Sequence, residues 1–124
     1  MDNKKIGAAA EDFALSFLEK KGLSLVVRNY VTPYGEADII MLNKEQYVFV
    51  EVKARKSFKY GTPADAVNKK KKLRYLQIAQ YFFMQNNIND YAVRFDVVEI
   101  FIAEKTYINY IPNAYDFTDI VDYY

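Results

Sequence analysis

The chain of 124 residues contains no cysteine, no histidine and no tryptophan. Without cysteine it can form no disulfide, no thiolate nucleophile and no cysteine-bound zinc site. Without histidine it also lacks Ser-His and Cys-His triads and paired-histidine acid–base chemistry. Any catalysis would therefore depend on carboxylates, lysines, tyrosines or a metal held by oxygen ligands.

Long apolar runs are missing as well. No run approaches the roughly 18 residues of a membrane span, and the first residues, MDNKKIGAAAEDF, lack a continuous apolar signal core. We therefore expect no membrane contact, and the lack of cysteine is consistent with a cytoplasmic location. With 52% hydrophobic residues, we expect residues 1–124 to form one domain around a single core.

Two apolar stretches carry charges that buried strands have no folding reason to contain. The stretches ADIIML, residues 37–42, and YVFVEVKA, residues 47–54, are interrupted only by Asp38, Glu51 and Lys53. The apolar VFV before Glu51 favours a central strand covered on both faces, where a merely solvated glutamate would be costly. The competing interpretation is an edge hairpin with solvated charges and a surface Glu-Lys pair.

The length of the turn between these strands decides whether the charges meet. If all four intervening residues form a hairpin turn, Asp38 falls opposite Glu51 and Glu36 falls opposite Lys53. Because side chains alternate between faces, these four residues would share one face. A three-residue turn would instead place Ala37 opposite Glu51 and separate the carboxylates. We favour the first register, in which a divalent cation with oxygen ligands is the natural counter-ion for the acids.

Basic residues are concentrated in one segment. Residues 51–75 hold nine Lys or Arg and two acids, whereas residues 76–124 hold two basic and seven acidic residues. This segregation favours a polyanion such as DNA on one side of the protein. The alternative is that consecutive lysines on a helix simply spread around its solvated face. The candidate phosphate contacts are Arg55, Lys56, Lys59, Lys69, Lys70, Lys72 and Arg74.

Hydrophobic periodicity predicts an α/β protein. The first expected helix spans residues 4–21 and ends at Gly22, and the second spans residues 62–85 and starts at Thr62-Pro63-Ala64-Asp65. The expected strands span residues 23–31, 37–42, 47–54, 92–102 and 107–111. The predicted apolar stripe of the first helix consists of Ile6, Ala10, Phe13, Ala14 and Phe17. That of the second helix consists of Val67, Leu73, Leu76, Ala79 and Phe83. Glu11 lies at the margin of the first stripe, as a rim residue or as a contributor to a metal site.

Several short motifs together resemble a known family. Gly-Glu-Ala-Asp at residues 35–38 and Val-Phe-Val-Glu-Val-Lys-Ala-Arg at residues 48–55 are similar to the core of the PD-(D/E)XK nuclease superfamily, which includes restriction enzymes and Holliday junction resolvases. More narrowly, the chain resembles the YraN-like family of small bacterial proteins. That likeness extends to Gly7 to Glu11, Arg28-Asn29-Tyr30, Tyr60-Gly61, Ala66, Lys72, residues 94–98 and Asn113-Ala114-Tyr115.

The chain departs from the family pattern at two positions. Ala8 stands where the family often has Glu, and Ala37 stands where it usually has a larger aliphatic residue. The superfamily's Pro before the Asp is also absent, as is usual in this family, so the superfamily assignment rests on the spacing. None of these departures falls on an expected metal ligand.

The resemblance implies a restriction endonuclease-like fold, in which helices flank a central mixed β-sheet. It also implies metal-dependent hydrolysis of phosphodiester bonds in DNA. The likeness to resolvases extends this expectation to branched or structured DNA and to a homodimer.

The resemblance also implies roles for individual residues. Asp38, Glu51 and the backbone carbonyl of Val52 would hold Mg²⁺ or Mn²⁺, and Lys53 would orient water or offset charge on the phosphate. Glu11 and Glu36 are expected near a second metal or its water shell. Glu11 maps onto the superfamily's helical acid, and Glu36 belongs to the family's Gly-Glu-X-Asp pattern.

Two other classes of function stay open at this point. One is a nucleic-acid-binding module on a nuclease scaffold that does not cut and acts with a partner. The other is a protein-interaction domain whose acidic tail docks a basic partner. Most of the aromatic residues are expected in the core, and only Phe58, Tyr60 and Tyr34 are candidates for base stacking.

Overall fold

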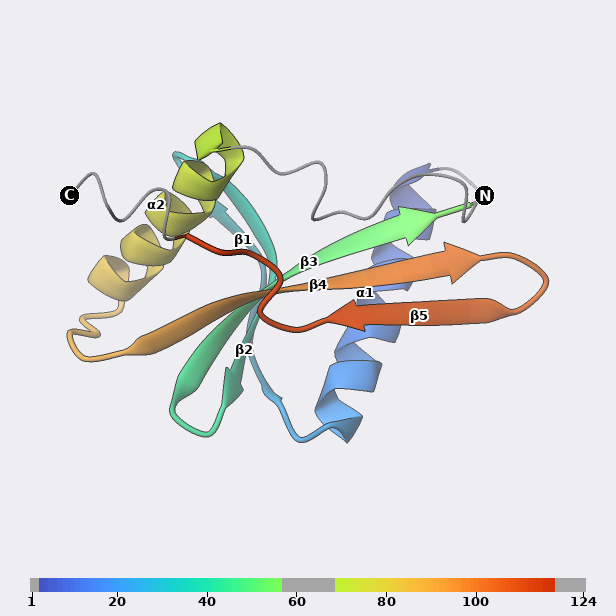
Figure 1. The fold of residues 1–124 in the computed structure, drawn as a ribbon, viewed down its shortest axis with the longest axis horizontal. Coiled ribbons are helices and arrows are strands. Elements are labelled where there is room, and N and C mark those ends of the chain that lie inside the picture. Colours follow the sequence, from blue (N-terminus) through green and yellow to red (C-terminus); the bar gives the residue numbers. More distant parts are fainter. Residues whose placement is uncertain (1–2, 57–68, 118–124) are drawn as a thin grey trace.

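The computed structural model describes residues 3–56 and 69–117. This part of the chain forms a five-stranded mixed sheet with one helix on each face (Figure 1). The elements are α1 (Asn3–Lys20), β1 (Ser24–Thr32), β2 (Gly35–Asn43), β3 (Gln46–Arg55), α2 (Lys69–Gln85), β4 (Ala92–Ile102) and β5 (Thr106–Ile111). The predicted fold class, helices flanking a central mixed sheet, is confirmed.

The strands lie in the sheet in their chain order, β1-β2-β3-β4-β5. Neighbours are antiparallel except β3 and β4, which run parallel. A parallel pair needs a long crossover, and α2 lies within the connection that joins these two strands. The crossover leaves the end of β3 that carries Glu51 and Lys53, so it starts beside the charges of that strand.

Both helices end in the same capping arrangement. At the end of α1, the N–H of Leu23 donates to the carbonyl of Leu18, and Gly22 takes a φ of 97°. At the end of α2, the N–H of Ile88 donates to the carbonyl of Phe83, and Asn87 takes a φ of 54°. Glycine and asparagine tolerate this left-handed conformation best, so the predicted stop at Gly22 and the end of α2 near residue 85 are both confirmed.

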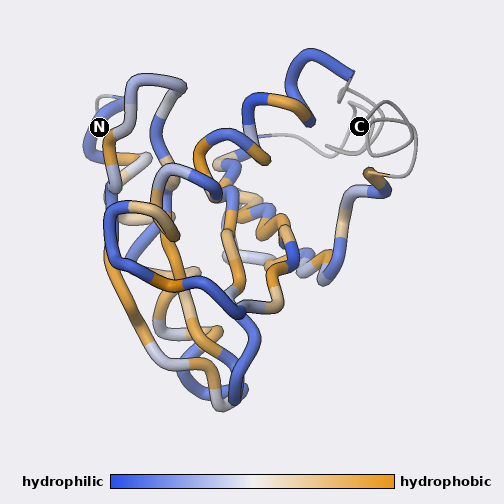
Figure 2. The backbone as a smooth tube through the Cα atoms, turned by 90° about the vertical axis from the view of Figure 1, so that its left-hand side faces the viewer, coloured by the Kyte–Doolittle hydropathy of each residue, from blue (hydrophilic) through white to orange (hydrophobic). Residues whose placement is uncertain are grey.

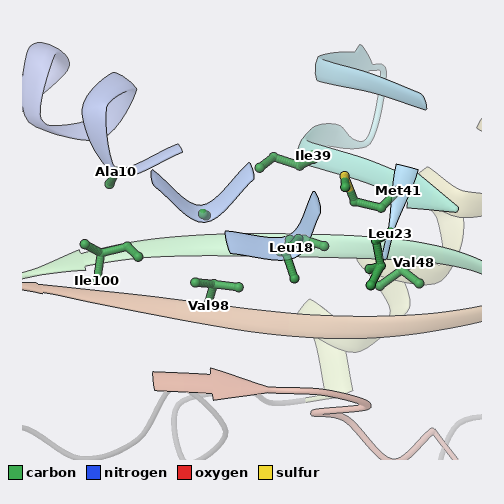
Figure 3. Packing of buried hydrophobic residues seen from close by; sticks show 10 residues of the cluster. Ala10, Leu18, Leu23, Ile39, Met41, Val48, Val98 and Ile100 are labelled. Carbon is green, nitrogen blue, oxygen red and sulfur yellow. The ribbon is translucent and has the colours of Figure 1, made fainter. Parts of the chain in front are cut away.

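The first core layer lies between α1 and the sheet (Figure 3). Ala10, Ala14 and Leu18 of α1 are buried against side chains of β2, β3 and β4. The predicted apolar stripe is wrong at Phe13, whose side chain is 49% exposed. The buried line runs through Leu18 instead, so α1 is rotated about its axis relative to the prediction, which brings Glu11 closer to the sheet.

The second core layer lies between α2 and the opposite face of the sheet. Helix α2 buries Ile78, Ala79, Phe82 and Phe83, whereas the predicted Leu73 and Leu76 are only partly buried. Val67 and the predicted helix start at residues 62–65 lie outside the described residues. Figure 2 shows hydrophobic stretches along the strands and within α2, and hydrophilic loops at the lower end of the view. Within residues 3–56 and 69–117, no helix is long and apolar enough to cross a membrane.

A buried carboxylate anchors the segment that follows β5. Asp96 of β4 is 1% exposed and accepts hydrogen bonds from Arg94, from the hydroxyl of Tyr110 and from the backbone N–H of Asn113. The next residue, Ala114, donates its N–H to the carbonyl of Phe95 at 2.7 Å. These bonds turn the chain across the sheet towards α2, as Figure 1 shows for the red segment after β5.

We expect Leu18→Ala to lower the free energy of unfolding by about 2–5 kcal/mol, because the leucine is completely buried between α1 and the sheet. The matched control on the same helix is Phe13→Ala, which should cost less than about 1 kcal/mol because that ring is half exposed. Urea denaturation of both variants measures the difference. Equal losses would contradict the observed rotation of α1.

Candidate active site

The β2–β3 hairpin has the register that brings the acids together. Leu42 pairs with Tyr47 and Ile39 pairs with Val50, as the sequence predicted. One detail differs: Asn43 also pairs with Gln46, so the tip of the turn holds two residues rather than four. Continuing this register by one position places Asp38 opposite Glu51.

The strand pairing stops at this point. Ile39–Val50 is the last pair between β2 and β3, whereas β3 stays paired with β4 as far as Arg55. In Figure 1 the right-hand half of β3 runs beside β4 and away from β2. The backbone N–H of Val52 donates instead to a carboxylate oxygen of Asp38 at 2.9 Å. The side chain of Asp38 thus takes the place of a strand carbonyl where the hairpin opens.

The regular alternation of side chains breaks at the same place. Ala37 and Ile40, three positions apart, are both buried on the α2 side, while Ile39 is buried on the α1 side. The neighbouring strand shows the same change, because Val27 and Tyr30 both pack on the α2 side. The predicted strict alternation that placed Glu36, Asp38, Glu51 and Lys53 on one face is therefore wrong for β2. The irregularity coincides with Asn29, which takes a left-handed φ of 52°.

Because of this break, Glu36 lies between the two sides of the sheet. It lines the pocket described below, and its carboxylate also lies near Glu11 of α1. The amide of Asn29 joins them: with its nitrogen turned towards the acids, it donates to Glu36 and to Glu11, each at 3.1 Å. Arg28 offsets part of the negative charge, with its guanidinium 3.5 Å from Glu11 and 2.7 Å from Asp12.

Asp38 is the carboxylate most perturbed by these surroundings. Its pKa is raised from 3.8 to about 6, chiefly by burial, and the hydrogen bond from Val52 only partly opposes this shift. The negative charges of Glu11, Glu51 and Glu36 contribute to the same rise. The structure therefore brings four of the predicted acids into electrostatic contact, from α1, β2 and β3.

Lys53 lies beside this acid cluster. Its ammonium is 3.8 Å from Glu51 Oε1, and a second ammonium, that of Lys71 on α2, is 3.6 Å from the same oxygen. Burial lowers the pKa of Lys53, which the charge of Glu51 opposes. The sequence predicted Lys53 on the same face as Glu51, while the approach of Lys71 was not predicted.

Two tyrosine hydroxyls complete the surroundings of Glu51. Tyr75 of α2 donates to Glu51 Oε2, and Tyr115, after β5, donates to the same oxygen at 3.0 Å. Burial and the negative charge of Glu51 raise the pKa of both hydroxyls well above the usual value, so both stay protonated donors. These roles were not predicted from the sequence. Tyr115 belongs to the Asn113-Ala114-Tyr115 motif, which was a signal, whereas Tyr75 shows only the spacing of a core aromatic residue.

These residues surround a pocket of about 120 Å³, large enough for several water molecules. One wall carries carboxylates and the remainder is largely apolar and aromatic. Its lining includes Glu36, Asp38, Glu51, Tyr75, Ile78, Phe95 and Tyr115. Gly35 borders it closely: a Cβ there would lie 3.3 Å from Ile78, and its φ of 141° also favours glycine.

The predicted phosphate contacts divide into two groups. Arg55 and Lys72 are engaged within the protein, since Arg55 lies 3.4 Å from Glu99 and Lys72 donates to the carbonyl of Asp116 at 2.6 Å. Lys56, Lys69, Lys70 and Arg74 are exposed. Lys59 lies outside the described residues, as do the stacking candidates Phe58 and Tyr60. The third stacking candidate, Tyr34, is 46% exposed and its ring packs edge-on against Tyr81.

The donor set fits a hydrated magnesium ion better than a closed cage. Among residues 3–56 and 69–117, no three acidic side chains are grouped closely enough to enclose a metal ion. Mg²⁺, however, is commonly held by only one or two carboxylates together with waters and substrate phosphates. Asp38 and Glu51, on facing strands beside a pocket for water, meet that requirement.

Comparison with known proteins assigns the family. The family model described as "Uncharacterised protein family UPF0102" matches residues 10–100. The chain belongs to the UPF0102 family. UPF0102 is the YraN family and lies in the PD-(D/E)XK nuclease superfamily, so the resemblance seen in the motifs is confirmed.

Relatives match over almost the whole chain. A UPF0102 protein of Clostridioides difficile is 39% identical over 115 residues, which cover 93% of this chain and all of the relative. UPF0102 proteins of Alkaliphilus oremlandii and Caldicellulosiruptor bescii are each 44% identical, over 91% and 93% of this chain and 99% and 100% of their own lengths. The chain and these relatives thus share almost their whole length.

We expect Asp38→Asn to stabilise the metal-free protein. The folded state holds the proton of Asp38 more tightly than the unfolded chain, so the ionised carboxylate costs stability at pH values above about 6. Removing the charge should therefore raise the free energy of unfolding at about pH 7.5 by roughly 1–3 kcal/mol. The gain should shrink as the pH falls through about 6 towards 3.8.

Denaturation at several pH values, with metal removed by chelation, measures this effect. Asp90→Asn, at an exposed aspartate beyond the end of α2, is the matched control and should change little at any pH. A destabilised Asp38→Asn protein at neutral pH would show that the Val52 hydrogen bond outweighs the charge repulsion.

Proposed function

We propose that this UPF0102 protein is a metal-dependent endonuclease that hydrolyses phosphodiester bonds in DNA. The observation that carries the proposal is the convergence of four acids, Glu11, Glu36, Asp38 and Glu51, with Lys53 beside Glu51. Three of these acids, Glu36, Asp38 and Glu51, line a pocket that has room for water. Carboxylates crowded at a partly buried site are costly alone and are stabilised by a cation. Family membership places the chain in a nuclease superfamily but gives no activity.

In this proposal, Asp38, Glu51 and the backbone carbonyl of Val52 hold a Mg²⁺ or Mn²⁺ ion. The bound ion would polarise the scissile phosphate and lower the pKa of a water molecule. Asp38 is fixed for this role because the Val52 N–H holds one of its oxygens, and the other remains for a ligand. Glu11 and Glu36 add negative charge around Asp38 and accept hydrogen bonds from water.

Lys53 acts on the phosphate and on the attacking water. Its ammonium lies on the Oε1 side of Glu51, next to the pocket acids. A lysine there holds the water oxygen in line with the phosphorus and offsets the charge that grows on the phosphate oxygens. The water gives up a proton to the solvent as its oxygen bonds to phosphorus, the ester bond to the leaving oxygen breaks, and that oxygen takes up a proton from the solvent.

Basic residues beyond the acids supply the contacts to the DNA backbone. Lys70 and Arg74 are exposed on α2, and Lys56 is exposed just after β3. Arg74 lies close to Gly35 at the border of the pocket. Positive charges on α2 and at the end of β3, the two elements that carry Tyr75 and Glu51, would hold a phosphate backbone near the pocket.

One observation favours a second candidate, a DNA-binding module that does not cut. The carboxylate of Glu51 already has two ammonium groups and two tyrosine hydroxyls around it, as a scaffold that holds no metal would show. A binding module would show the same salt-dependent affinity for DNA as the nuclease. Unlike the nuclease, it would cleave no DNA with any divalent metal.

We expect the wild-type protein to cut DNA in the presence of Mg²⁺ or Mn²⁺, and Lys53→Ala to reduce the rate by at least about 10²-fold. DNA affinity should hardly change, because Lys53 is one of many nearby basic residues. The assay compares linear, single-stranded, flapped and four-way-junction DNA.

Lys105→Ala, an exposed lysine in the turn between β4 and β5, should cut at the wild-type rate. Cutting by Lys53→Ala at the wild-type rate would indicate a contaminating nuclease or another site. No cutting of any substrate by the wild type would favour the binding module.

DNA affinity should fall steeply with salt, and the exposed basic residues should set the slope. Replacing Lys56, Lys70 and Arg74 by Ala should flatten the plot of log K against log[salt] by up to about 0.9 unit for each lost phosphate contact. Fluorescence anisotropy with labelled DNA at several salt concentrations measures the slope.

The matched control removes the same number of charges elsewhere, at Lys20, Lys44 and Lys105, which are exposed at the end of α1 and in two turns. This triple variant should keep the wild-type slope. Equal flattening in both triple variants would show that net charge, rather than a defined surface, governs binding.

A further inference from the structure

The two oxygens of the Glu51 carboxylate have different surroundings. Oε2 accepts hydrogen bonds from the hydroxyls of Tyr75 and Tyr115. Within residues 3–56 and 69–117, the neighbours of Oε1 are two ammonium groups, those of Lys53 at 3.8 Å and Lys71 at 3.6 Å. Both distances are longer than a hydrogen bond. One oxygen is therefore fully engaged by donors, while the other remains able to accept a ligand.

Both tyrosines are held rigidly by packing. The ring of Tyr75 stacks on Phe95 with centroids 6.1 Å apart and lies 5.4 Å from the ring of Tyr115. Tyr115 is 6% exposed, and Phe117 packs against its ring. The hydroxyls therefore approach Glu51 from two separate elements, and neither can turn away without disturbing a buried aromatic cluster.

The backbone on either side of Tyr115 is also fixed. Ala114 donates its N–H to the carbonyl of Phe95, and the carbonyl of Asp116 accepts a hydrogen bond from Lys72. Lys72 and Tyr75 lie on the same helix, three residues apart. The segment after β5 and α2 thus hold each other, and together they hold Glu51.

We propose that Tyr75 and Tyr115 are positioning residues that bind one oxygen of Glu51 and so present Oε1 alone to a divalent cation. This inference rests on the proposed function, since it concerns the same site. Neither tyrosine touches the cation or the DNA; both act through Glu51. The tyrosines thereby set how Glu51 binds, as a one-oxygen ligand with a fixed direction.

Hydrogen bonds to a ligand residue matter because a free glutamate side chain samples many rotamers. Partners that orient a metal ligand typically change metal affinity or activity by about 10- to 100-fold when removed. Hydroxyls that merely occupied Glu51 and kept it from a cation would have the opposite effect, because their removal would tighten metal binding. The sign of the change therefore separates positioning from competition.

The experiment uses the full chain with Tyr75→Phe, Tyr115→Phe and the double variant, each of which removes one or both hydroxyls and keeps the rings. Isothermal titration with Mn²⁺ should show about 10-fold weaker binding for each single variant. The double variant should lose less than the product of the single losses, because both hydroxyls bind the same oxygen. Glu51→Gln identifies the site by abolishing the same binding.

Tyr110→Phe is the matched control. It also removes a hydroxyl that donates to a carboxylate, but that carboxylate is the buried Asp96, which anchors the segment after β5. A loss of Mn²⁺ affinity in Tyr110→Phe equal to that in Tyr75→Phe would assign the effect to weakened folding and overturn the inference. Melting temperatures of all variants, measured with chelator present, give the folding contribution separately.

The kinetic readout is the second test. If the wild type cuts DNA, the Tyr→Phe variants should show a lower kcat at saturating Mn²⁺ with unchanged DNA affinity, because the tyrosines lie behind Glu51. Wild-type protein that binds no Mn²⁺ overturns both this inference and the proposed function. Wild-type binding with unchanged or tighter binding in the Tyr→Phe variants overturns this inference alone.

Discussion

The hydrogen bond between the N–H of Val52 and the carboxylate of Asp38 is the interaction on which the rest of the site depends. At this point β2 and β3 stop pairing, and β3 continues with only β4 as a neighbour. An unpaired N–H inside a sheet is costly, so an opening hairpin needs an acceptor from elsewhere. Asp38 supplies it, and is thereby held within reach of the charges of Glu11 and Glu51.

Much of the fold and part of the site could be predicted from the sequence, because they follow from periodic patterns. The hairpin register followed from strand length and the placement of charges, and β4 begins and ends where predicted. The break in alternation could not be predicted, because it involves two neighbouring strands at once and coincides with the left-handed backbone of Asn29 on β1. The pattern of apolar residues in 37–42 carries no information about the backbone conformation of the neighbouring strand β1.

The partners of Glu51 were hidden for a different reason. Tyr75 lies on a helix among aromatic residues that do fill the core, so its ring follows the expected pattern and only its hydroxyl departs from it. Tyr115 reaches Glu51 from 64 positions further along the chain, through a turn held by Asp96. Sequence patterns describe neighbours within an element, whereas this contact depends on how the elements pack.

The dependence of Glu51 on Tyr115 has a consequence for how the protein matures. A domain generally folds as a unit, and here the unit includes the segment after β5. The acids of α1, β2 and β3 all precede residue 115 in the chain, so Glu51 gains its second hydroxyl partner only when that segment packs against α2. A chain that stops after β5 would carry all the acids without one of the two hydroxyls that hold Glu51.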